Sequence, residues 1–99
     1  MFLVMVNYSK PLEVIDALLP DHVRFLEVHY AAGVFLASGR QVPRTGGVIL
    51  ARSDSREDLE AILAQDPFAV HQAAQYQVME FSPTMAAPEL AFLLETASG

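Results

Sequence analysis

Hydrophobic residues occur in two patterns along the chain, and the first pattern predicts four strands. Each predicted strand is a short run of large or β-branched residues that ends at turn-forming residues. The first run begins at Phe2 and stops before the turn formers Ser9-Lys10-Pro11. The four predicted strands are residues 2–8, 34–38, 48–52 and 76–81.

In the second pattern, apolar residues recur at the spacing of an amphipathic helix. Pro20 lacks an N–H and crowds the preceding turn, so we expect it to end one helix and to open the next. Gly33 supplies a stop signal, and Ser53, Asp54 and Ser55 compete to cap a later helix. The predicted helices are residues 12–19, 20–32, 56–64, 67–74 and 88–94, Asp66 is the predicted cap of the fourth, and residues 39–47 are a predicted loop.

The order strand, helix, strand, strand, helix, strand predicts an α+β fold. We expect a ferredoxin-like βαββαβ domain whose four-stranded antiparallel sheet carries its helices on one face. An antiparallel sheet with a wet second face alternates apolar and polar residues. The first strand does not alternate in this way, because Phe2, Val4 and Val6 point to one face and Leu3 and Met5 to the other.

Strands two and three are also apolar on both faces, so something must cover the face that the helices leave open. We expect a sheet-to-sheet homodimer, and the sequence sets no upper limit on higher oligomers. A C-terminal extension, residues 86–99, is expected to dock at the dimer interface through Leu90, Leu93 and Leu94. A helix this short does not persist alone in water.

Composition narrows the function classes. A chain of 99 residues suits one domain, and its net charge of −6 with scattered cations leaves no basic stripe for nucleic acid. No apolar run approaches the ~20 residues of a membrane span. The N-terminal run from Met1 to Val6 lacks the basic region of a signal peptide. The absence of Cys excludes disulfides and thiol chemistry and fits a reducing cytoplasm.

Three segments together resemble the YCII-related (YciI-like) family. They are HYAAGVFLASGRQVPRTGGVILA at residues 29–51, the DPF triplet at residues 66–68, and YQVMEF at residues 76–81. The resemblance spans residues 1–85, which we take as the domain. It implies a ferredoxin-like fold that pairs as a dimeric α/β barrel. It also implies a His–Asp pair in a pocket, which falls on His22 and Asp66 by motif match.

The predicted pair suits acid–base chemistry. His22 would lie in the first turn of the helix opened by Pro20, where the helix dipole disfavours imidazolium. A nearby carboxylate acts in the opposite direction and fixes the tautomer, so that the pair can serve as a general base near neutral pH. The alternative is structural, because an Asp before Pro commonly caps a helix and His22 then only caps or packs.

The segment from Ser38 to Gly47 is a second candidate site. Two arginines and a hydroxyl beside flexible glycines can hold an anionic or carbonyl-bearing ligand. We assign Ser38, Gly39 and Arg44, together with Phe68 of the DPF triplet, to substrate binding. The alternative is a plain β connection whose glycines permit tight turns.

Metal and nucleotide sites are not expected. His29 lies ~10 Å along a helix from His22, too far to share one metal ion. His29 and His71 fit surface or half-buried positions, and the HxxxH and HExxH spacings are absent. The glycine-rich motifs of nucleotide-binding loops are also missing. We therefore expect no metal and no cofactor.

Two functions remain open. The first is a cofactor-free enzyme, a lyase or isomerase, that acts on a small polar or aromatic molecule. Elimination, isomerisation and proton abstraction beside a carbonyl are within the reach of one imidazole. Oxygen-dependent oxidation of an aromatic ring, which other dimeric α/β barrels perform, is a related option. The second function is a non-catalytic dimeric module for metabolite binding or assembly.

Overall fold

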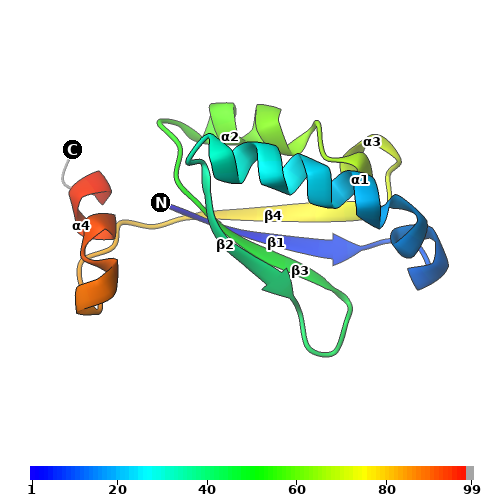
Figure 1. Ribbon diagram of the computed structural model, residues 1–99, viewed down its shortest axis with the longest axis horizontal. Coiled ribbons are helices and arrows are strands. Elements are labelled where there is room, and N and C mark those ends of the chain that lie inside the picture. The colour runs from blue at the N-terminus through cyan, green and yellow to red at the C-terminus, as the bar shows by residue number, and fades with distance from the viewer. Residues whose placement is uncertain (98–99) are drawn as a thin grey trace.

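Four antiparallel strands form one sheet, in the order β2-β3-β1-β4, and helices cover one of its faces (Figure 1). The computed structural model describes residues 1–97. The sheet consists of β1 (Phe2–Tyr8), β2 (Phe35–Arg40), β3 (Gly46–Ala51) and β4 (Ala74–Glu80). The helices are α1 (Leu12–Ala31), α2 (Arg56–Leu63), α3 (Pro67–Val70), η1 (Pro88–Leu90) and α4 (Phe92–Ala97). This strand order and helix placement are the predicted ferredoxin-like α+β fold.

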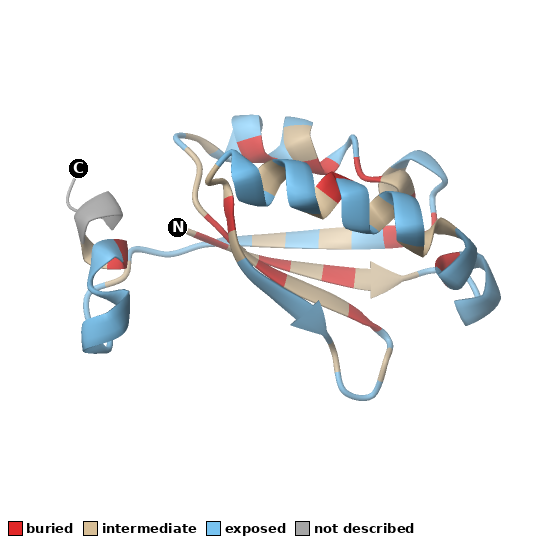
Figure 2. Cartoon of the chain, viewed as in Figure 1, coloured by how far each residue is buried: buried red, intermediate tan, exposed pale blue. Residues whose placement is uncertain are grey.

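The central strand β1 alternates between the covered face and the open face of the sheet. Phe2, Val4 and Val6 are buried under the helices, as the red bands on this strand show (Figure 2). Val4 pairs with Ile49 of β3 on one side and with Val78 of β4 on the other. Since directly paired residues share a face, these side chains form one layer of the core.

The open face is apolar along its two central strands. On this face Leu3 pairs with Leu50, and Met5 pairs with Val48; all four are partly exposed in the single chain. The edge strand β4 presents Met79, which pairs with Leu3, and the polar Gln75 and Gln77 there. The expected apolar open face is therefore confirmed for β1 and β3.

On β2 the open face carries Ala37, which pairs with Leu50, and Gly39, which pairs with Val48. A register irregularity between Phe35 and Ala37 interrupts its pairing with β3. Beyond this irregularity the strand runs out to Arg40, and its last four residues are exposed.

Helix α1 is continuous, so the prediction of two helices separated by Pro20 is wrong. The helix runs from Leu12 to Ala31 with Pro20 inside it. A proline removes one backbone hydrogen bond and bends a helix. Figure 1 shows the first turns (blue) at an angle to the rest (cyan). Ile15 and Phe25 are buried on either side of Pro20, so packing against the sheet holds both halves in place. His22 consequently lies inside the helix and not in its first turn.

The remaining boundaries differ from the predictions by a few residues. The connection between β2 and β3 is residues 41–45, because both strands extend further than expected. Gly33 has a φ of 78° and ends α1 as predicted. Ser55 is the residue that caps α2, since its side chain accepts the Asp58 N–H at 3.1 Å. Helix α3 ends at Val70 and not near Ala74, because Gln72 takes a φ of 54° before β4 begins.

The C-terminal segment lies apart from the sheet and its helices. Figure 1 shows η1 and α4 at the end of an extended stretch that follows β4. Leu93 is buried, whereas Leu90 and Phe92 are exposed. No helix within the described residues is long and apolar enough to cross a membrane.

Candidate active site

The predicted histidine and aspartate are in direct contact. His22 Nδ1 lies 2.8 Å from Asp66 Oδ1, although the two residues are 44 positions apart in the chain. Helix α1 supplies His22, and Asp66 is the residue immediately before α3. Asp66 is fully buried, whereas the His22 side chain retains 12% of its exposure. The packing of α1 against α3 therefore brings the pair together.

Asp66 also caps α3, so the same carboxylate both caps this helix and contacts His22. Its Oδ1 accepts the Phe68 N–H at 3.0 Å as well as the contact from His22. Its other oxygen, Oδ2, accepts the Tyr76 hydroxyl at 2.6 Å. These donors fix the carboxylate in one orientation, because each lies at hydrogen-bond distance from a defined oxygen.

Tyr76 is a member of the site that the sequence analysis did not single out. Burial, followed by the negative charge of Asp66 and the hydrogen bond to it, raises the pKa of Tyr76 well above its usual range. The hydroxyl therefore keeps its proton and acts as a donor. One signal was available: Tyr76 alternates with Val78 in a predicted strand, which favours the covered face, and the hydroxyl of a buried tyrosine usually requires a partner.

The contact with Asp66 determines the tautomer of His22, whereas the expected effect of the helix dipole on the charge of the ring is absent. The expected dipole effect depended on a helix beginning at Pro20, and it fails because α1 begins at Leu12. A carboxylate at Nδ1 favours the tautomer with the proton on Nδ1. The ring nitrogen Nε2 is then the acceptor available to a bound molecule.

Aromatic packing holds the plane of the imidazole. The ring of His22 stacks on that of Phe68, with centroids 4.0 Å apart and planes 11° apart. Tyr8 meets Phe68 edge-on, with centroids 5.9 Å apart. Phe68 was predicted to contact substrate, and the structure places it beside His22 on the wall of a cavity.

That cavity has a volume of about 200 Å³ and lies between α1 and the covered face of the sheet. It brings together His22, Ser38, Gly39, Arg44 and Phe68, which are all the predicted site residues except Asp66. Asp66 lies behind His22. The rest of the wall is Val6, Tyr8, Leu19, Val23, Leu26, Arg40, Gly46, Gly47, Val48 and Ile49.

The segment from Ser38 to Gly47 is held by specific contacts, which a plain turn would not require. Ser38 Oγ lies 2.6 Å from the Tyr30 hydroxyl on α1. Arg44 Nη2 donates to Asp16 Oδ1 of α1 at 2.5 Å. The amide of Gln41 donates to the Val6 carbonyl oxygen at 3.3 Å.

The glycines around this connection do not form its turn, so the alternative of a plain connection with turn-forming glycines is wrong. Gly39 and Gly46 belong to strands. At Gly46 a Cβ would lie 1.8 Å from the Val6 carbonyl oxygen. Close approach of β1 therefore requires glycine at this position.

The other two histidines lie outside the cavity wall. His29 packs against Phe25 and Phe35, and burial lowers its pKa. His71 is exposed at the end of α3. Within residues 1–97, no group of three or more His, Asp or Glu side chains is arranged to hold a metal ion.

Comparison with known proteins supports this fold and shows the family. The solved structure of 5-chloro-2-hydroxyhydroquinone dehydrochlorinase from Burkholderia phenoliruptrix, in complex with 2,5-dihydroxybenzoquinone, is similar to this chain with a TM-score of 0.69 and 17% identity. The match covers 82% of this chain and 93% of the dehydrochlorinase chain, and at this identity it shows a shared fold. A search of curated proteins finds no match. The YCII-related domain model matches residues 1–82, and the chain therefore belongs to the YCII-related family, as its motifs predict.

Proposed function

We propose that the chain is a cofactor-free enzyme that carries out acid–base chemistry on a small molecule through His22 and Asp66. The observation that carries this proposal is the 2.8 Å contact between His22 Nδ1 and Asp66 Oδ1, with His22 also on the wall of the cavity. A base must lie within hydrogen-bond reach of the proton that it takes, and Nε2 of a wall residue meets that requirement for a molecule in the cavity.

The proposed chemistry begins with a neutral His22 that carries its proton on Nδ1. Nε2 takes a proton from the substrate, and the imidazolium that forms lies against the carboxylate of Asp66. That carboxylate stabilises the new positive charge and holds the ring in orientation. Tyr76 and the Phe68 N–H keep the carboxylate in place throughout, since neither has to move. Ser38 and Arg44 are the proposed contacts to substrate.

Among the reactions open to one imidazole, elimination has the strongest support. The structural neighbour is named a dehydrochlorinase, and dehydrochlorination is an elimination. In that step a base takes a proton from one carbon, the electron pair forms a double bond, and chloride leaves the neighbouring carbon with its bonding pair. A single histidine can supply this base. The proposal for this chain is a base-assisted elimination or the related proton abstraction beside a carbonyl.

The test is turnover by the wild-type chain and by a His22→Gln variant. A panel of small ring and carbonyl compounds, including 5-chloro-2-hydroxyhydroquinone, would be screened by chloride release and by loss of substrate protons in NMR. His22→Gln is expected to lower turnover about 10²- to 10⁴-fold while the fold is retained. His71→Gln is the matched control, because this histidine is exposed and away from the cavity. Full turnover by His22→Gln, or loss of stability alone, would favour a structural role for the pair.

A further inference from the structure

The cavity wall carries positively charged side chains and no negatively charged ones. Arg40 and Arg44 line the cavity together with His22, and none of its lining residues is an Asp or a Glu. The chain as a whole has the opposite balance, with 12 acidic residues against six Lys and Arg. Two of its six cations therefore face one small cavity. A guanidinium fork matches the geometry of carboxylates and other oxyanions.

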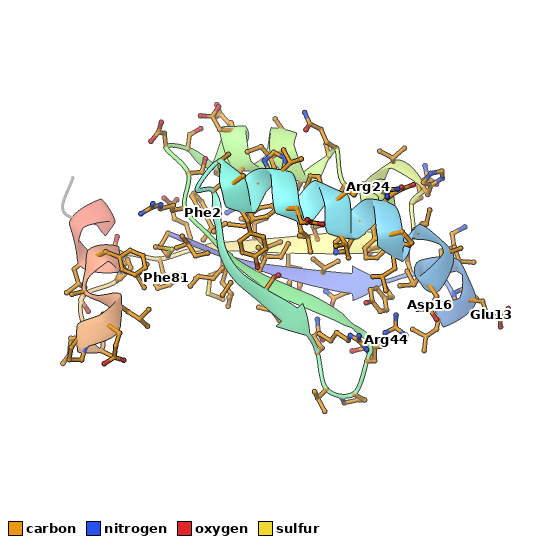
Figure 3. All side chains as sticks on the ribbon, viewed as in Figure 1. Phe2, Glu13, Asp16, Arg24, Arg44 and Phe81 are labelled. Atoms are coloured by element: carbon orange, nitrogen blue, oxygen red, sulfur yellow. The ribbon has the colours of Figure 1, made fainter. Side chains whose placement is uncertain are left out.

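Arg44 is held in place with part of its hydrogen-bonding capacity unused. It reaches from the β2–β3 connection to Asp16 on the first half of α1, as the labelled side chains show (Figure 3). Asp16 is not a cavity residue. The Nε of Arg44 is buried and has no hydrogen-bond partner among the residues that the structure describes. A buried donor without an acceptor is costly, so this side chain carries hydrogen-bonding capacity that the chain itself leaves unused.

Arg44 also keeps its charge. The hydrogen bond to Asp16 is the main cause that raises the pKa of Arg44 above its usual value, and burial acts in the opposite direction. Asp16 accepts from Nη2, and a hydrogen bond with Tyr8 raises the pKa of Arg44 further. The guanidinium thus remains a cation on the cavity wall, and its side chain keeps 26% of its exposure.

The size and the walls of the cavity limit the ligand. The cavity holds about 200 Å³, and an apolar cavity of about 150 Å³ already takes benzene in another protein. Tyr8, Phe68 and His22 give it aromatic walls. These dimensions suit one ring with a few substituents and are too small for a nucleotide.

We infer that the cavity binds a single-ring compound through an anionic oxygen group, a carboxylate or an ionised ring hydroxyl, which Arg44 receives. The ring then lies against the aromatic wall, with its reacting carbon toward His22. The inference depends on the proposed function only where it places the reacting carbon near His22. An arginine at this point would also stabilise the negative charge that builds on an enolate oxygen when His22 removes a proton.

Binding can be tested without turnover. Isothermal titration calorimetry would compare 2,5-dihydroxybenzoate with 2,5-dihydroxybenzamide, which has the same shape but no charge. The wild-type chain is expected to bind the carboxylate at least about tenfold more tightly, which corresponds to one charged hydrogen bond. Equal affinity for the two compounds, or binding of neither, would overturn the inference.

Variants then assign the preference to Arg44. Arg44→Gln is expected to remove the preference for the carboxylate and to leave amide binding unchanged. Arg24→Gln makes the same change in charge at a side chain that is 70% exposed and paired with Asp21, and it should retain the preference. Asp16→Asn breaks the ion pair of Arg44 without removing its guanidinium, and it should also retain the preference.

If Asp16→Asn loses the preference as fully as Arg44→Gln does, Arg44 acts by holding the loop and the inference is wrong. Should Arg44→Gln fail to fold, Arg44→Lys replaces it. That variant keeps the charge but lacks the planar guanidinium fork, and it is expected to lose most of the preference; full retention would contradict the assignment. His22→Gln separates the two proposals, because it should keep the carboxylate preference even though it stops turnover.

Discussion

The Tyr76 hydroxyl donates to Asp66 Oδ2 at 2.6 Å, while His22 contacts the other oxygen of the same carboxylate. Asp66 thus joins a residue on the cavity wall to a residue of β4 that does not line this cavity. The fully buried carboxylate depends on both neighbours, because a buried acceptor that loses its donor bears the full cost of desolvation. Tyr76 is therefore a positioning residue in the proposed mechanism.

Tyr76→Phe is the first prediction. The variant leaves Asp66 Oδ2 without its donor, and we expect the free energy of unfolding to fall by about 1–3 kcal/mol. The chemical shift of the His22 Nδ1 proton in NMR should also move, because the carboxylate that binds it has changed. Tyr30→Phe is the control, since the Tyr30 hydroxyl contacts the exposed Ser38 and should matter much less. An unchanged Nδ1 proton signal would contradict a positioning role.

The sequence predicted the layers of the fold more accurately than it predicted the site. Alternation along β1 assigned Phe2, Val4 and Val6 to the buried face, because a two-residue period needs no knowledge of other strands. The contact between His22 and Asp66 spans 44 residues and depends on how α1 packs against α3. No local periodicity encodes that packing, and the family resemblance was needed to pair the two residues.

The wrong sequence predictions share one physical cause, because in each case a tertiary contact outweighs a local signal. Pro20 is a strong local signal for a helix end, but Ile15 and Phe25 anchor both halves of α1 to the sheet, and tertiary packing outweighs one lost hydrogen bond. Sequence patterns did not indicate Tyr76, because its partner Asp66 comes within reach only when α3 packs beside β4. Gly46 was placed in the predicted loop. It lies in β3, where the close approach of the β1 backbone requires glycine.

Gly46→Ala is the second prediction. A Cβ at this position would lie 1.8 Å from the Val6 carbonyl oxygen, so that the β1–β3 pairing must shift. We expect the free energy of unfolding to fall by at least about 3 kcal/mol. Gly39→Ala is the matched control, because no atom lies within 4 Å of the corresponding Cβ. Urea denaturation of both variants checks the difference, and equal stability would show that the strands absorb the change.

The third prediction concerns His29 and pH. Burial lowers the pKa of His29 in the folded chain from its ordinary value of 6.5. Below pH 6.5 the unfolded chain therefore binds a proton that the folded chain resists. The stability linked to His29 is present above this pH and is lost as the pH falls through the lowered folded value.

The comparison uses urea denaturation of wild type and His29→Gln at about pH 7.5 and about pH 5.5. Wild type should lose more stability between the two values than the variant does. His22 and His71 titrate in both proteins, so the difference between them isolates His29. Identical losses would mean that His29 takes up its proton equally in both states.

A homodimer is the fourth prediction. We propose that a second copy covers the open face of the sheet over Leu3, Met5, Val48 and Leu50. Met5→Lys places a charge at the centre of that face and is expected to give a monomer in sedimentation experiments. Val70→Lys is the control, because Val70 is a 63% exposed apolar residue on α3, away from the sheet face. A dimer that survives Met5→Lys would exclude this face as the interface.

The fifth prediction concerns the C-terminal segment. It follows from the area that two sheet faces can bury against each other. Four strands of ordinary length and spacing present a face of roughly 350 Å², and two such faces fall short of the roughly 1,200 Å² of a standard interface. The segment extends away from its own sheet with Met85, Leu90 and Phe92 exposed, so it can supply the missing area by docking on the partner. Deleting residues 84–99 should weaken the dimer while leaving the strands of residues 1–82 intact. An unchanged dimer after the deletion would assign the whole interface to the sheet and leave the segment without a part in assembly.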